Sequence, residues 1–525
     1  MLIESPWMTL EPYPRLNLAH FLEVCGSRFG PRPAAVTPEG KEYSFDDIIL
    51  WSKKLARFLQ DEGISKGDVV GIFSTNIPEY FIAFQGILRA GAVVTPINTL
   101  YRDHEVRDQL VDSGAVLLLA SRSLLATAQA AVAGLPHVKA LCMEELWEWA
   151  AEAPPEPRPV EIDPLNDLAV LPYSSGTTGL PKGVILTHYN LTSNIRQALT
   201  MGYSTSYSIG LSFLPYYHIY AMTILMNCGF AMGEKQVVMP GFNPEQLLSL
   251  IEQHKVTDLF VVPPALLILI NNPAFAKYDM SSLRFICSAA APLPAELGEQ
   301  SRRAFKCPIA EAYGMSETSP LINIAPPSMI SPGFVGPPAA DTTEKIVDLT
   351  TDEELAPDGV GELLVMGPQV MKGYWNQPLA TAETMTDDGW LRTGDIARAD
   401  ERGFIQIVDR KKEMIKYKGH QIAPAELEAL LLEHPGVLDA AVIPKRQADG
   451  NEIPKAFIVR RPGMTVDESD IEAFVEERVA PYKKVREIEF LDLIPKSLAG
   501  KILRRELIER ERQKEAASDL TAGGT

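Results

Sequence analysis

The sequence YSSGTTGLPKG, residues 173–183, directly follows the apolar run DLAVLP, residues 167–172. It combines three glycines with four serine and threonine hydroxyls and Lys182. Glycine permits positive φ angles, and backbone amides, hydroxyls and an ammonium group all bind phosphate, so the stretch indicates a phosphate-binding loop. The alternative is a glycine-rich hairpin whose hydroxyls bond only to the backbone.

The loop does not match the Walker pattern G-x-x-x-x-G-K-[ST]. Counted from Gly176, the second glycine of that pattern is replaced by Pro181, and Gly183 stands where serine or threonine is needed. A phosphate-binding loop of a different family is therefore expected. Its candidate contacts are Ser174, Ser175, Thr177, Thr178 and Lys182.

Length and charge limit the class of protein. A chain of 525 residues exceeds what one hydrophobic core supports, so two or more domains are expected. Asp and Glu number 68 against 49 Lys and Arg, and the net charge of -19 argues against a nucleic-acid-binding surface. An anionic substrate would have to be bound by individually placed lysines and arginines.

Cysteine usage and the apolar segments indicate a cytoplasmic protein. Its cysteines form no C-x-x-C pair and are odd in number, which is typical of a reducing compartment. The first residues, MLIESPWMTLEPYPRL, lack the basic and apolar regions of a secretory signal. No apolar run is long enough to span a bilayer, so we expect no transmembrane segment, and peripheral membrane contact stays open. The cysteines are Cys25, Cys142, Cys228, Cys287 and Cys307.

The first half of the chain has the pattern of an α/β protein. Apolar runs such as VVGIFS, residues 69–74, alternate with amphipathic segments such as residues 44–63, which predicts parallel strands with crossover helices. The proline-rich residues 154–164 predict a linker to a second α/β subdomain, with a helix over 243–255 and a strand over 256–264. After about residue 335, short strands and turns predict a β subdomain.

The last hundred residues predict a compact α+β module. Strands are expected over 414–419, 438–445 and 455–461, and helices over 423–437 and 467–479. The polar sequence that follows predicts a disordered tail from about residue 512.

Six further motifs follow the loop in order along the chain. They are LPYYHIYAMT (214–223), SAAAPL (288–293), EAYGMSET (311–318), WLRTGD (390–395), DRKKEMIKYKGHQIAPAELE (409–428) and PKSLAGKILRREL (495–507). Together they resemble the adenylate-forming (ANL) acyl-CoA synthetase superfamily. The resemblance implies an α/β fold with a large N-terminal domain, residues 1–411, of two α/β subdomains and a β subdomain, followed by a small mobile α+β C-terminal lid, residues 412–525.

The resemblance also implies a reaction in two steps. A carboxylate attacks the α-phosphate of ATP and gives acyl-AMP and pyrophosphate; the thiolate of coenzyme A then displaces AMP and forms the thioester. A carboxylate is a poor electrophile until one of its oxygens becomes part of a good leaving group, and AMP provides that leaving group.

The ATP contacts are implied motif by motif. Tyr313 would lie against adenine, Ser316 would contact phosphate, and Glu317 would bind Mg²⁺, which prefers carboxylate and phosphate oxygens. Asp395 would accept hydrogen bonds from the ribose hydroxyls, and Arg410 would be the second ribose contact. The ATP- or AMP-binding set is Ser174, Thr177, Thr178, Lys182, Ala290, Glu311, Ala312, Tyr313, Ser316, Asp395 and Arg410.

Two positions depart from the family pattern. Ser316 stands where threonine is common and keeps the hydroxyl, whereas Ala312 stands where glycine is common and adds bulk. Taken alone, Glu317 would be interpreted as a solvated surface carboxylate.

The lid motifs imply the remaining catalytic and coenzyme A residues. Lys501 would bridge the carboxylate and ATP in the first step, and Lys412 would lie at the hinge about which the lid rotates. Without the family match, Lys501 would be assigned to the basic face of a terminal helix. The strand that turns inward for thioester formation would carry Lys416 and Gln421 as catalytic residues and Lys418 and Gly419 as coenzyme A contacts.

The acid substrate is expected to lie beside His218, which would line the route between acyl pocket and coenzyme A tunnel. A histidine on an apolar segment is more often a core residue than a base, so its proton role stays open. The implied pocket wall is almost wholly apolar, which favours a medium- or long-chain fatty acid. Its residues are Tyr220, Ile224, Gly314, Pro320 and Leu321, together with Cys287 and Ala290.

The leading interpretation is thus an AMP-forming acid–thiol ligase that uses ATP, Mg²⁺ and coenzyme A with a small carboxylic acid, most favourably a fatty acid. The alternatives are a 4-coumarate-like aryl-CoA ligase and an adenylation enzyme that loads a carrier protein. No carrier domain is recognisable after the lid, which disfavours the modular form of the last alternative. A nucleotide-binding regulator would be expected to lack the catalytic lysines, and no residue speaks for luciferase-type chemistry. The sequence leaves monomer and homodimer open.

Overall fold

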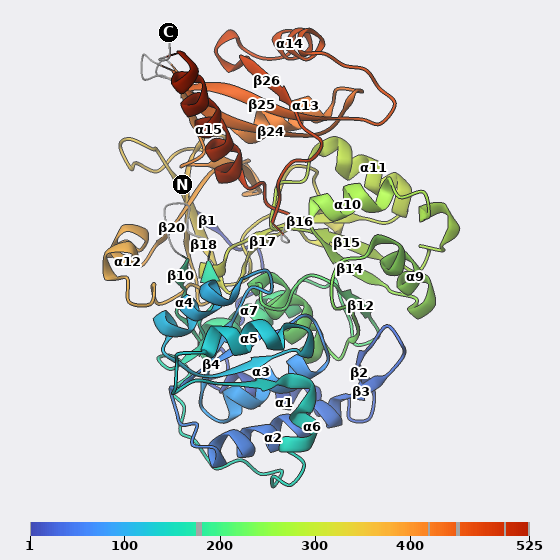
Figure 1. Cartoon of the computed structure of the whole chain (residues 1–525), viewed down its shortest axis with the longest axis vertical. Coiled ribbons are helices and arrows are strands. Elements are labelled where there is room, and N and C mark those ends of the chain that lie inside the picture. Colours follow the sequence, from blue (N-terminus) through green and yellow to red (C-terminus); the bar gives the residue numbers. More distant parts are fainter. Residues whose placement is uncertain (1, 175–180, 418–419, 448–451, 498–499, 523–525) are drawn as a thin grey trace.

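A six-stranded sheet forms the first α/β subdomain of the computed structural model, which describes residues 2–174, 181–417, 420–447, 452–497 and 500–522 (Figure 1). Its central strands are parallel, and only the edge strand β11 is antiparallel. The predicted pattern of parallel strands and crossover helices is therefore confirmed. The strands, in sheet order, are β11 (Leu186–Thr187), β8 (Leu168–Val170), β5 (Val93–Pro96), β4 (Val69–Phe73), β6 (Ala115–Ala120) and β7 (Lys139–Cys142).

Helices cover both subdomains and begin where the sequence provides caps. Helix α2 begins after Ser44, whose side chain and that of Asp47 form a reciprocal capping box, and its apolar face is buried. The α-helices in the first 200 residues are α1 (Leu18–Gly26), α2 (Phe45–Asp61), α3 (Glu79–Arg89), α4 (Asp103–Ser113), α5 (Leu125–Val132), α6 (Leu146–Trp149) and α7 (His188–Leu199).

An eight-stranded sheet forms the second α/β subdomain. Strands β12, β14, β15 and β16 run parallel, so their carboxyl ends share one edge. Three of the motifs identified in the sequence follow or include these strand ends. In sheet order the strands are β17 (Leu321–Ile324), β16 (Ile309–Gly314), β15 (Phe285–Ser288), β14 (Asp258–Val261), β12 (Ile209–Ser212), β13 (Lys235–Val238), β2 (Pro33–Val36) and β3 (Glu42–Ser44). The helices are the π-helix η3 (Ala221–Cys228), α8 (Gly229–Met232), α9 (Pro244–His254), α10 (Pro263–Ile270) and α11 (Ala295–Phe305).

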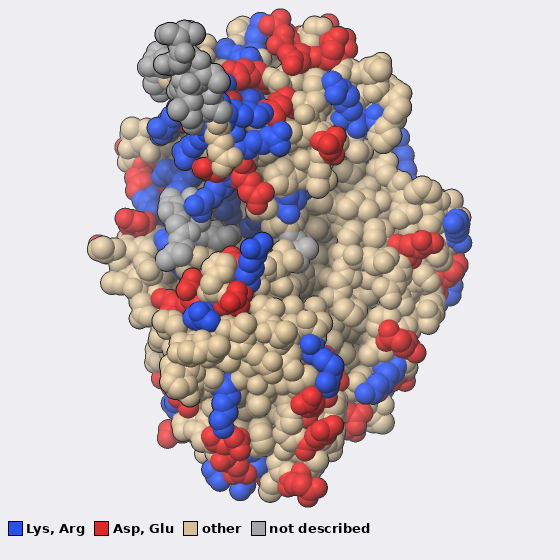
Figure 2. Space-filling view, viewed as in Figure 1, with Lys and Arg blue, Asp and Glu red and all other residues tan. Residues whose placement is uncertain are grey.

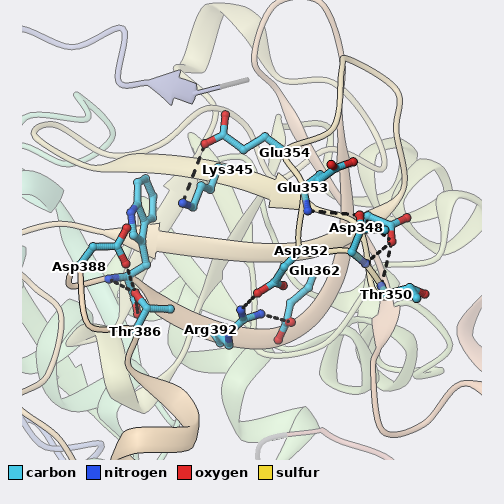
Figure 3. Close-up of polar contacts among 12 residues, drawn as sticks. Lys345, Asp348, Thr350, Asp352, Glu353, Glu354, Glu362, Thr386, Asp388 and Arg392 are labelled. Carbon is cyan, nitrogen blue, oxygen red and sulfur yellow. Dashed lines mark hydrogen bonds and ion pairs between the residues drawn. The ribbon is translucent and has the colours of Figure 1, made fainter.

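A five-stranded antiparallel sheet forms the β subdomain. Its strands are β1 (Leu2–Glu4), β18 (Thr343–Val347), β19 (Gly361–Met366), β20 (Leu391–Ala399) and β21 (Ile405–Arg410), and α12 (Pro378–Thr384) packs beside β20. Figure 3 shows Arg392 lying between Asp352 and Glu362, with which it forms ion pairs. Glu362 also pairs with Lys411 at 2.8 Å, so the chain is held to this sheet as far as residue 411.

The C-terminal domain has a core of its own above the large domain (Figure 1). Leu427 and Leu431 of α13 pack on Val442 and Ile458 of its sheet. Its elements are β22 (Ile415–Tyr417), β23 (His420–Ile422), α13 (Pro424–Leu432), β24 (Val437–Arg446), β25 (Glu452–Arg460), α14 (Glu468–Glu476), β26 (Glu487–Phe490) and α15 (Arg504–Ala522).

The expected disorder from about residue 512 is not observed over 512–522, where α15 continues to Ala522. The segment is rich in Glu, Lys, Arg and Ala, which are strong helix formers. Glu511 also pairs with Lys445 at 2.8 Å and Lys455 at 2.5 Å, so α15 is fixed to β24 and β25. Within the described ranges, no helix combines the length and apolar character that crossing a membrane requires.

Candidate active site

A cleft of about 2760 Å³ lies between the C-terminal domain and the carboxyl edge of the eight-stranded sheet. Figure 2 shows it as a hollow with lysine and arginine side chains gathered at its upper rim. The cleft is lined by residues of nearly every motif that the sequence analysis identified. The predicted residues on its wall are Ser174, Lys182, His218, Tyr220, Ile224, Cys287, Ala290, Glu311, Ala312, Tyr313, Gly314, Ser316, Glu317, Pro320, Leu321, Asp395, Arg410, Lys412, Lys416 and Lys501.

Asp395 is the centre of a buried polar group. The Tyr313 hydroxyl donates to Oδ2 of Asp395 at 2.5 Å, and Nε of Arg410 lies 3.1 Å from Oδ1. Asp395 and Arg410 are direct partners in the β20–β21 ladder, whereas Tyr313 comes from β16. The structure thus brings together the three residues predicted for adenosine, although they come from two sheets.

The glycine-rich loop begins and ends as a hairpin. Strand β9 (Tyr173–Ser174) pairs with β10 (Lys182–Gly183), and Ser174 stands opposite Lys182. The hairpin interpretation and the phosphate interpretation are therefore compatible, since the paired residues Ser174 and Lys182 line the cleft. The predicted contacts Ser175, Thr177 and Thr178 lie outside the described residues.

Glu317 lies at the base of this hairpin and is only 6% exposed. It accepts a hydrogen bond from the Tyr374 hydroxyl at 2.8 Å and a long one from the Ser174 hydroxyl at 3.5 Å. The Lys182 ammonium group lies 5.0 Å from the centre of the Tyr374 ring. The interpretation as a solvated surface carboxylate is wrong, because Glu317 is buried and faces the hairpin.

The donor set fits a magnesium ion that is held mainly by phosphate. Among the described residues, no group of three or more His, Cys, Asp or Glu side chains could hold a metal alone. Mg²⁺ typically uses one or two carboxylates with substrate phosphates and water. The single buried carboxylate of Glu317 beside the hairpin fits that arrangement.

Lys501 reaches the same cleft from the C-terminal domain. A Cβ placed on the preceding Gly500 would lie 2.8 Å from Cδ of Pro264, so this loop is pressed against α10 of the large domain. Burial against the cleft wall, followed by repulsion from Arg410, lowers the pKa of Lys501, while Asp395 and Glu317 act in the opposite direction. The ammonium group therefore lies within electrostatic reach of both acidic groups.

His218 is neutral near pH 7. Burial, followed by the positive charge of Lys501, lowers the pKa of His218 to about 4. A neutral imidazole with so low a pKa is a weak general base. The placement on the cleft wall agrees with the expected route to the acyl pocket, and it favours a lining role.

Strands β15 and β16 form the part of the cleft wall that carries residues predicted for both the nucleotide and the acid. Ala290, just beyond β15, has φ of 71°, a left-handed conformation that is unfavourable for a residue with a side chain. Glu311 accepts a hydrogen bond from the Gly333 amide at 2.8 Å, and burial raises the pKa of Glu311 to about 7. A Cβ on Gly314 would lie 2.1 Å from the Pro320 carbonyl oxygen, so only glycine fits there.

The acyl end of the cleft lies under η3. The Tyr220 hydroxyl donates to the Cys287 carbonyl at 3.3 Å, and Ile224 and Leu321 belong to the apolar cluster around Cys287. The rings of Tyr220, Phe260, Phe285 and Tyr203 follow one another, with successive centres 6.5, 5.6 and 4.7 Å apart. Three of these aromatic residues, Tyr203, Tyr220 and Phe260, line the cleft, so its wall is richer in aromatic groups than the sequence indicated.

The hairpin β22–β23 belongs to the C-terminal domain, and its Lys416 lines the cleft. Ile415 and Ile422 are buried in the core of the C-terminal domain, and the Lys416 side chain is exposed. The Gln421 backbone is paired with Lys416, but its side chain is outside the described residues, as are Lys418 and Gly419. Lys412 is exposed between β21 and β22.

Sequence analysis missed Tyr374, which contacts Glu317 and lies beside Lys182. Tyr374 lies in a segment whose short strands and turns are typical of a β subdomain. No local sequence pattern connects it with Glu317, which is 57 positions away.

A parallel-sheet domain with acidic, basic and hydroxyl groups at one strand edge, covered by a small domain that adds a lysine, defines a two-domain nucleotide-binding enzyme. The chain belongs to the AMP-binding enzyme family: that family model matches residues 22–375, and the AMP-binding enzyme C-terminal domain matches residues 426–501. The predicted membership of the adenylate-forming superfamily and the acid–thiol ligase class are confirmed.

Similar proteins cover almost the whole chain. 4-coumarate–CoA ligase 2 of Nicotiana tabacum is 38% identical over 499 residues, 92% of both chains. The anthranilate CoA ligase AuaEII in complex with anthranoyl-AMP has a TM-score of 0.89 at 27% identity and covers 97% of this chain and 100% of its own. ATP-bound MatB from Rhodopseudomonas palustris has a TM-score of 0.87 at 29% identity, and apo MatB 0.77 at 28%, each over 94% of this chain and 99% of the other.

Glu311 gives a pH-dependent prediction. With its pKa near 7, it is neutral below pH 7 and ionised above, and an extra negative charge in the cleft disfavours ATP. We expect the KM for ATP of the wild type, relative to that of Glu311→Gln, to rise by up to about tenfold per pH unit above pH 7. The ratio of the two variants cancels the titration of ATP itself, and a ratio independent of pH from 6 to about 8.5 would contradict the prediction.

Proposed function

We propose that the enzyme is an aryl-CoA ligase, which converts an aromatic carboxylic acid, ATP and coenzyme A into an aryl-type acyl-CoA, AMP and pyrophosphate with Mg²⁺. The observation that carries the proposal is the 38% identity to a 4-coumarate–CoA ligase over 92% of both chains. The sequence interpretation placed a fatty acid first, and the relatives favour its aryl alternative. A cytoplasmic location stays part of the proposal.

The aromatic wall supports this choice of acid. Edge-to-face ring contacts contribute about 0.5–1.5 kcal/mol beyond the burial of apolar area. Tyr220 and Phe260 meet at 79°, and Phe260 and Phe285 at 90°. A flat aromatic ring placed beside Tyr220 and Phe260 would extend this arrangement, whereas a flexible alkyl chain would gain only apolar burial.

In the first half-reaction, the chain's own residues position the two reactants. Lys182 and Ser174 on the hairpin would bind phosphate, Glu317 would hold Mg²⁺, and Asp395 with Tyr313 would bind the adenosine. Mg²⁺ when bound neutralises phosphate charge. Lys501 would donate from its ammonium group to the α-phosphate and the attacking carboxylate, and so stabilise charge that develops between them.

The described arrangement fits this half-reaction. Lys501 and the large-domain groups share one cleft, and the fold matches ATP-bound MatB at a TM-score of 0.87 against 0.77 for the apo form. Lys416 and Gln421 would act in the second half-reaction, for which the lid would take another orientation. Lys412 is exposed and directly follows Lys411, whose ion pair with Glu362 holds it to the β subdomain, and this supports the hinge at that position.

AMP release from a panel of acids tests the proposal. Hydroxycinnamates, benzoates and saturated fatty acids would be compared by kcat/KM, each with and without coenzyme A. We expect the hydroxycinnamate or benzoate class to exceed every fatty acid by at least about tenfold, and AMP release to require coenzyme A. A preference for fatty acids would contradict the choice of acid, and turnover that ignores coenzyme A would contradict the ligase.

Lys501→Ala should remove adenylation and spare thioester formation. Charge develops at the α-phosphate only in the first transition state, so we expect acyl-AMP formation to fall about 100-fold or more. The attack of coenzyme A on supplied acyl-AMP should change by less than about threefold. Lys496→Ala, a second lysine on the same loop, is the control; equal losses in both half-reactions of Lys501→Ala would refute the assignment.

Lys412→Pro should have the opposite effect. Proline fixes φ near about -65° and prevents the change of backbone angles that a hinge requires. Acyl-AMP formation should stay near wild type while thioester formation falls about 100-fold. Lys412→Ala controls for the lost charge, and wild-type overall turnover of the proline variant would place the hinge elsewhere.

A further inference from the structure

The acyl end of the cleft continues to a buried acid that the reaction does not use. The same cavity that is lined by Tyr220 and Ile224 also reaches Cys228, Gly229 and Glu234. Glu234 immediately precedes β13 and is only 4% exposed. It is therefore a buried carboxyl group, remote from the nucleotide-binding edge of the sheet.

The position of Glu234 follows from the parallel strands. The Glu234 carboxyl lies beside Gly210, which is paired near the amino ends of the parallel strands with Asp258, itself paired with Phe285. The motifs predicted to bind the nucleotide follow the opposite, carboxyl ends of these strands. Strand β14 spans Asp258–Val261, a rise of about 10 Å over three steps. Glu234 thus lies at the far end of a channel that follows one face of the sheet.

The carboxyl group fills the space that Gly210 leaves free and lies beside Gly229, where the Gln236 amide comes closer. A Cβ on Gly210 of β12 would lie 1.9 Å from Oε1, and one on Gly229 of α8 would lie 3.1 Å from Oε2. The carboxyl group consequently lies between the sheet and the helical layer that covers the acyl pocket. Its position is fixed by packing on both sides.

No hydrogen bond or ion pair engages the Glu234 carboxyl among the residues that the structure describes. The nearby Arg284 forms its hydrogen bonds with other residues. It donates to both oxygens of Asp258, at 2.9 and 3.2 Å, and to the Ser208 hydroxyl at 2.7 Å. Burial, followed by the charge of Asp258, raises the pKa of Glu234 well above its usual range. This shift favours the protonated carboxyl, which offers one O–H donor together with acceptor oxygens.

We propose that Glu234 determines specificity by hydrogen bonding to a hydroxyl group at the end of the acid substrate distant from its carboxylate. An unpartnered buried polar group costs free energy until a ligand satisfies it, and a pocket with such a group discriminates against analogues that lack the matching hydroxyl. The inference rests on the proposed function only in that the substrate is a carboxylic acid lying in this channel.

The test compares pairs of acids that differ only at the distal end. The aromatic pair is 4-hydroxycinnamate and 4-methylcinnamate, which have similar size, and the aliphatic pair is 8-hydroxyoctanoate and nonanoate. The ratio of kcat/KM within a pair is measured for the wild type, Glu234→Gln, which keeps a donor and an acceptor, and Glu234→Met, which keeps the shape. Met232→Leu, on the same cavity wall, is the control.

For any pair that the wild type turns over, we expect kcat/KM of the hydroxylated acid to exceed that of its partner by about tenfold or more. This ratio corresponds to about 1.4 kcal/mol. The ratio should fall to about 1 in Glu234→Met and persist in Glu234→Gln and Met232→Leu. If Glu234→Met does not fold, Gly210→Ala displaces the carboxyl group and should also lower the ratio. An unchanged ratio in these variants, or a wild-type ratio near 1, would overturn the inference.

The outcome separates this inference from the proposed function. Turnover of the aliphatic pair alone would refute the aryl-CoA ligase, and the ratio within that pair would still test Glu234. Turnover of the aromatic pair with a ratio that Glu234→Met leaves unchanged would refute only the inference. Turnover of neither pair by the wild type would overturn both.

Discussion

The Asp395 carboxylate connects the parts of the molecule that must act together. Tyr313 reaches it from the eight-stranded sheet, and Arg410 reaches it from the last strand before the hinge region. Its charge also opposes the loss of the proton from Lys501, which belongs to the C-terminal domain. Because both oxygens are engaged at a buried site, the carboxylate is held in one orientation, which would preorganise the proposed contact with ribose.

The chain passes from the β subdomain to the C-terminal domain just after Arg410 and Lys411. Glu362 pairs with Arg392 (Figure 3) and also with Lys411, so ion pairs hold the chain to the β subdomain up to the residue before the proposed hinge. Beyond it, the lid has its own core and contacts the large domain through short segments such as Gly500 against Pro264. A separate core and a small contact are what the proposed rotation of the lid would need, since substrates could then select between two orientations by differential binding.

Local patterns predicted much of this structure. Helices α2 and α9 follow from periodicity and caps, and the strands of both α/β subdomains follow from short apolar runs. The motif residues Tyr313, Glu317 and Asp395 were identified from sequence and do lie in one cleft. The three-residue strand β1 was not predicted, because its pairing with β18 is a contact across more than 330 positions and leaves no local signal.

Other features required the three-dimensional structure because they depend on packing. Tyr374 contacts Glu317 only through the fold, and helix α15 extends past the expected boundary because ion pairs on the lid add to its helix propensity. Glu234, in the polar segment GEKQ, has the sequence pattern of a solvated turn but is buried beside two glycines. The series of neighbouring rings from Tyr220 to Tyr203 was also beyond local reasoning, since it joins residues of separate elements.

The central claim is that this arrangement is one of two lid orientations, with Lys501 in the cleft for adenylation only. Distances between spin labels on Ile268→Cys and Leu493→Cys, both exposed positions, measure it directly by double electron–electron resonance, with Cys25→Ser removing the half-buried thiol. A non-hydrolysable ATP analogue should give one short distance, and a stable acyl-AMP analogue with coenzyme A should give a second, separate population. A single distance distribution that is the same with both ligands would contradict the account.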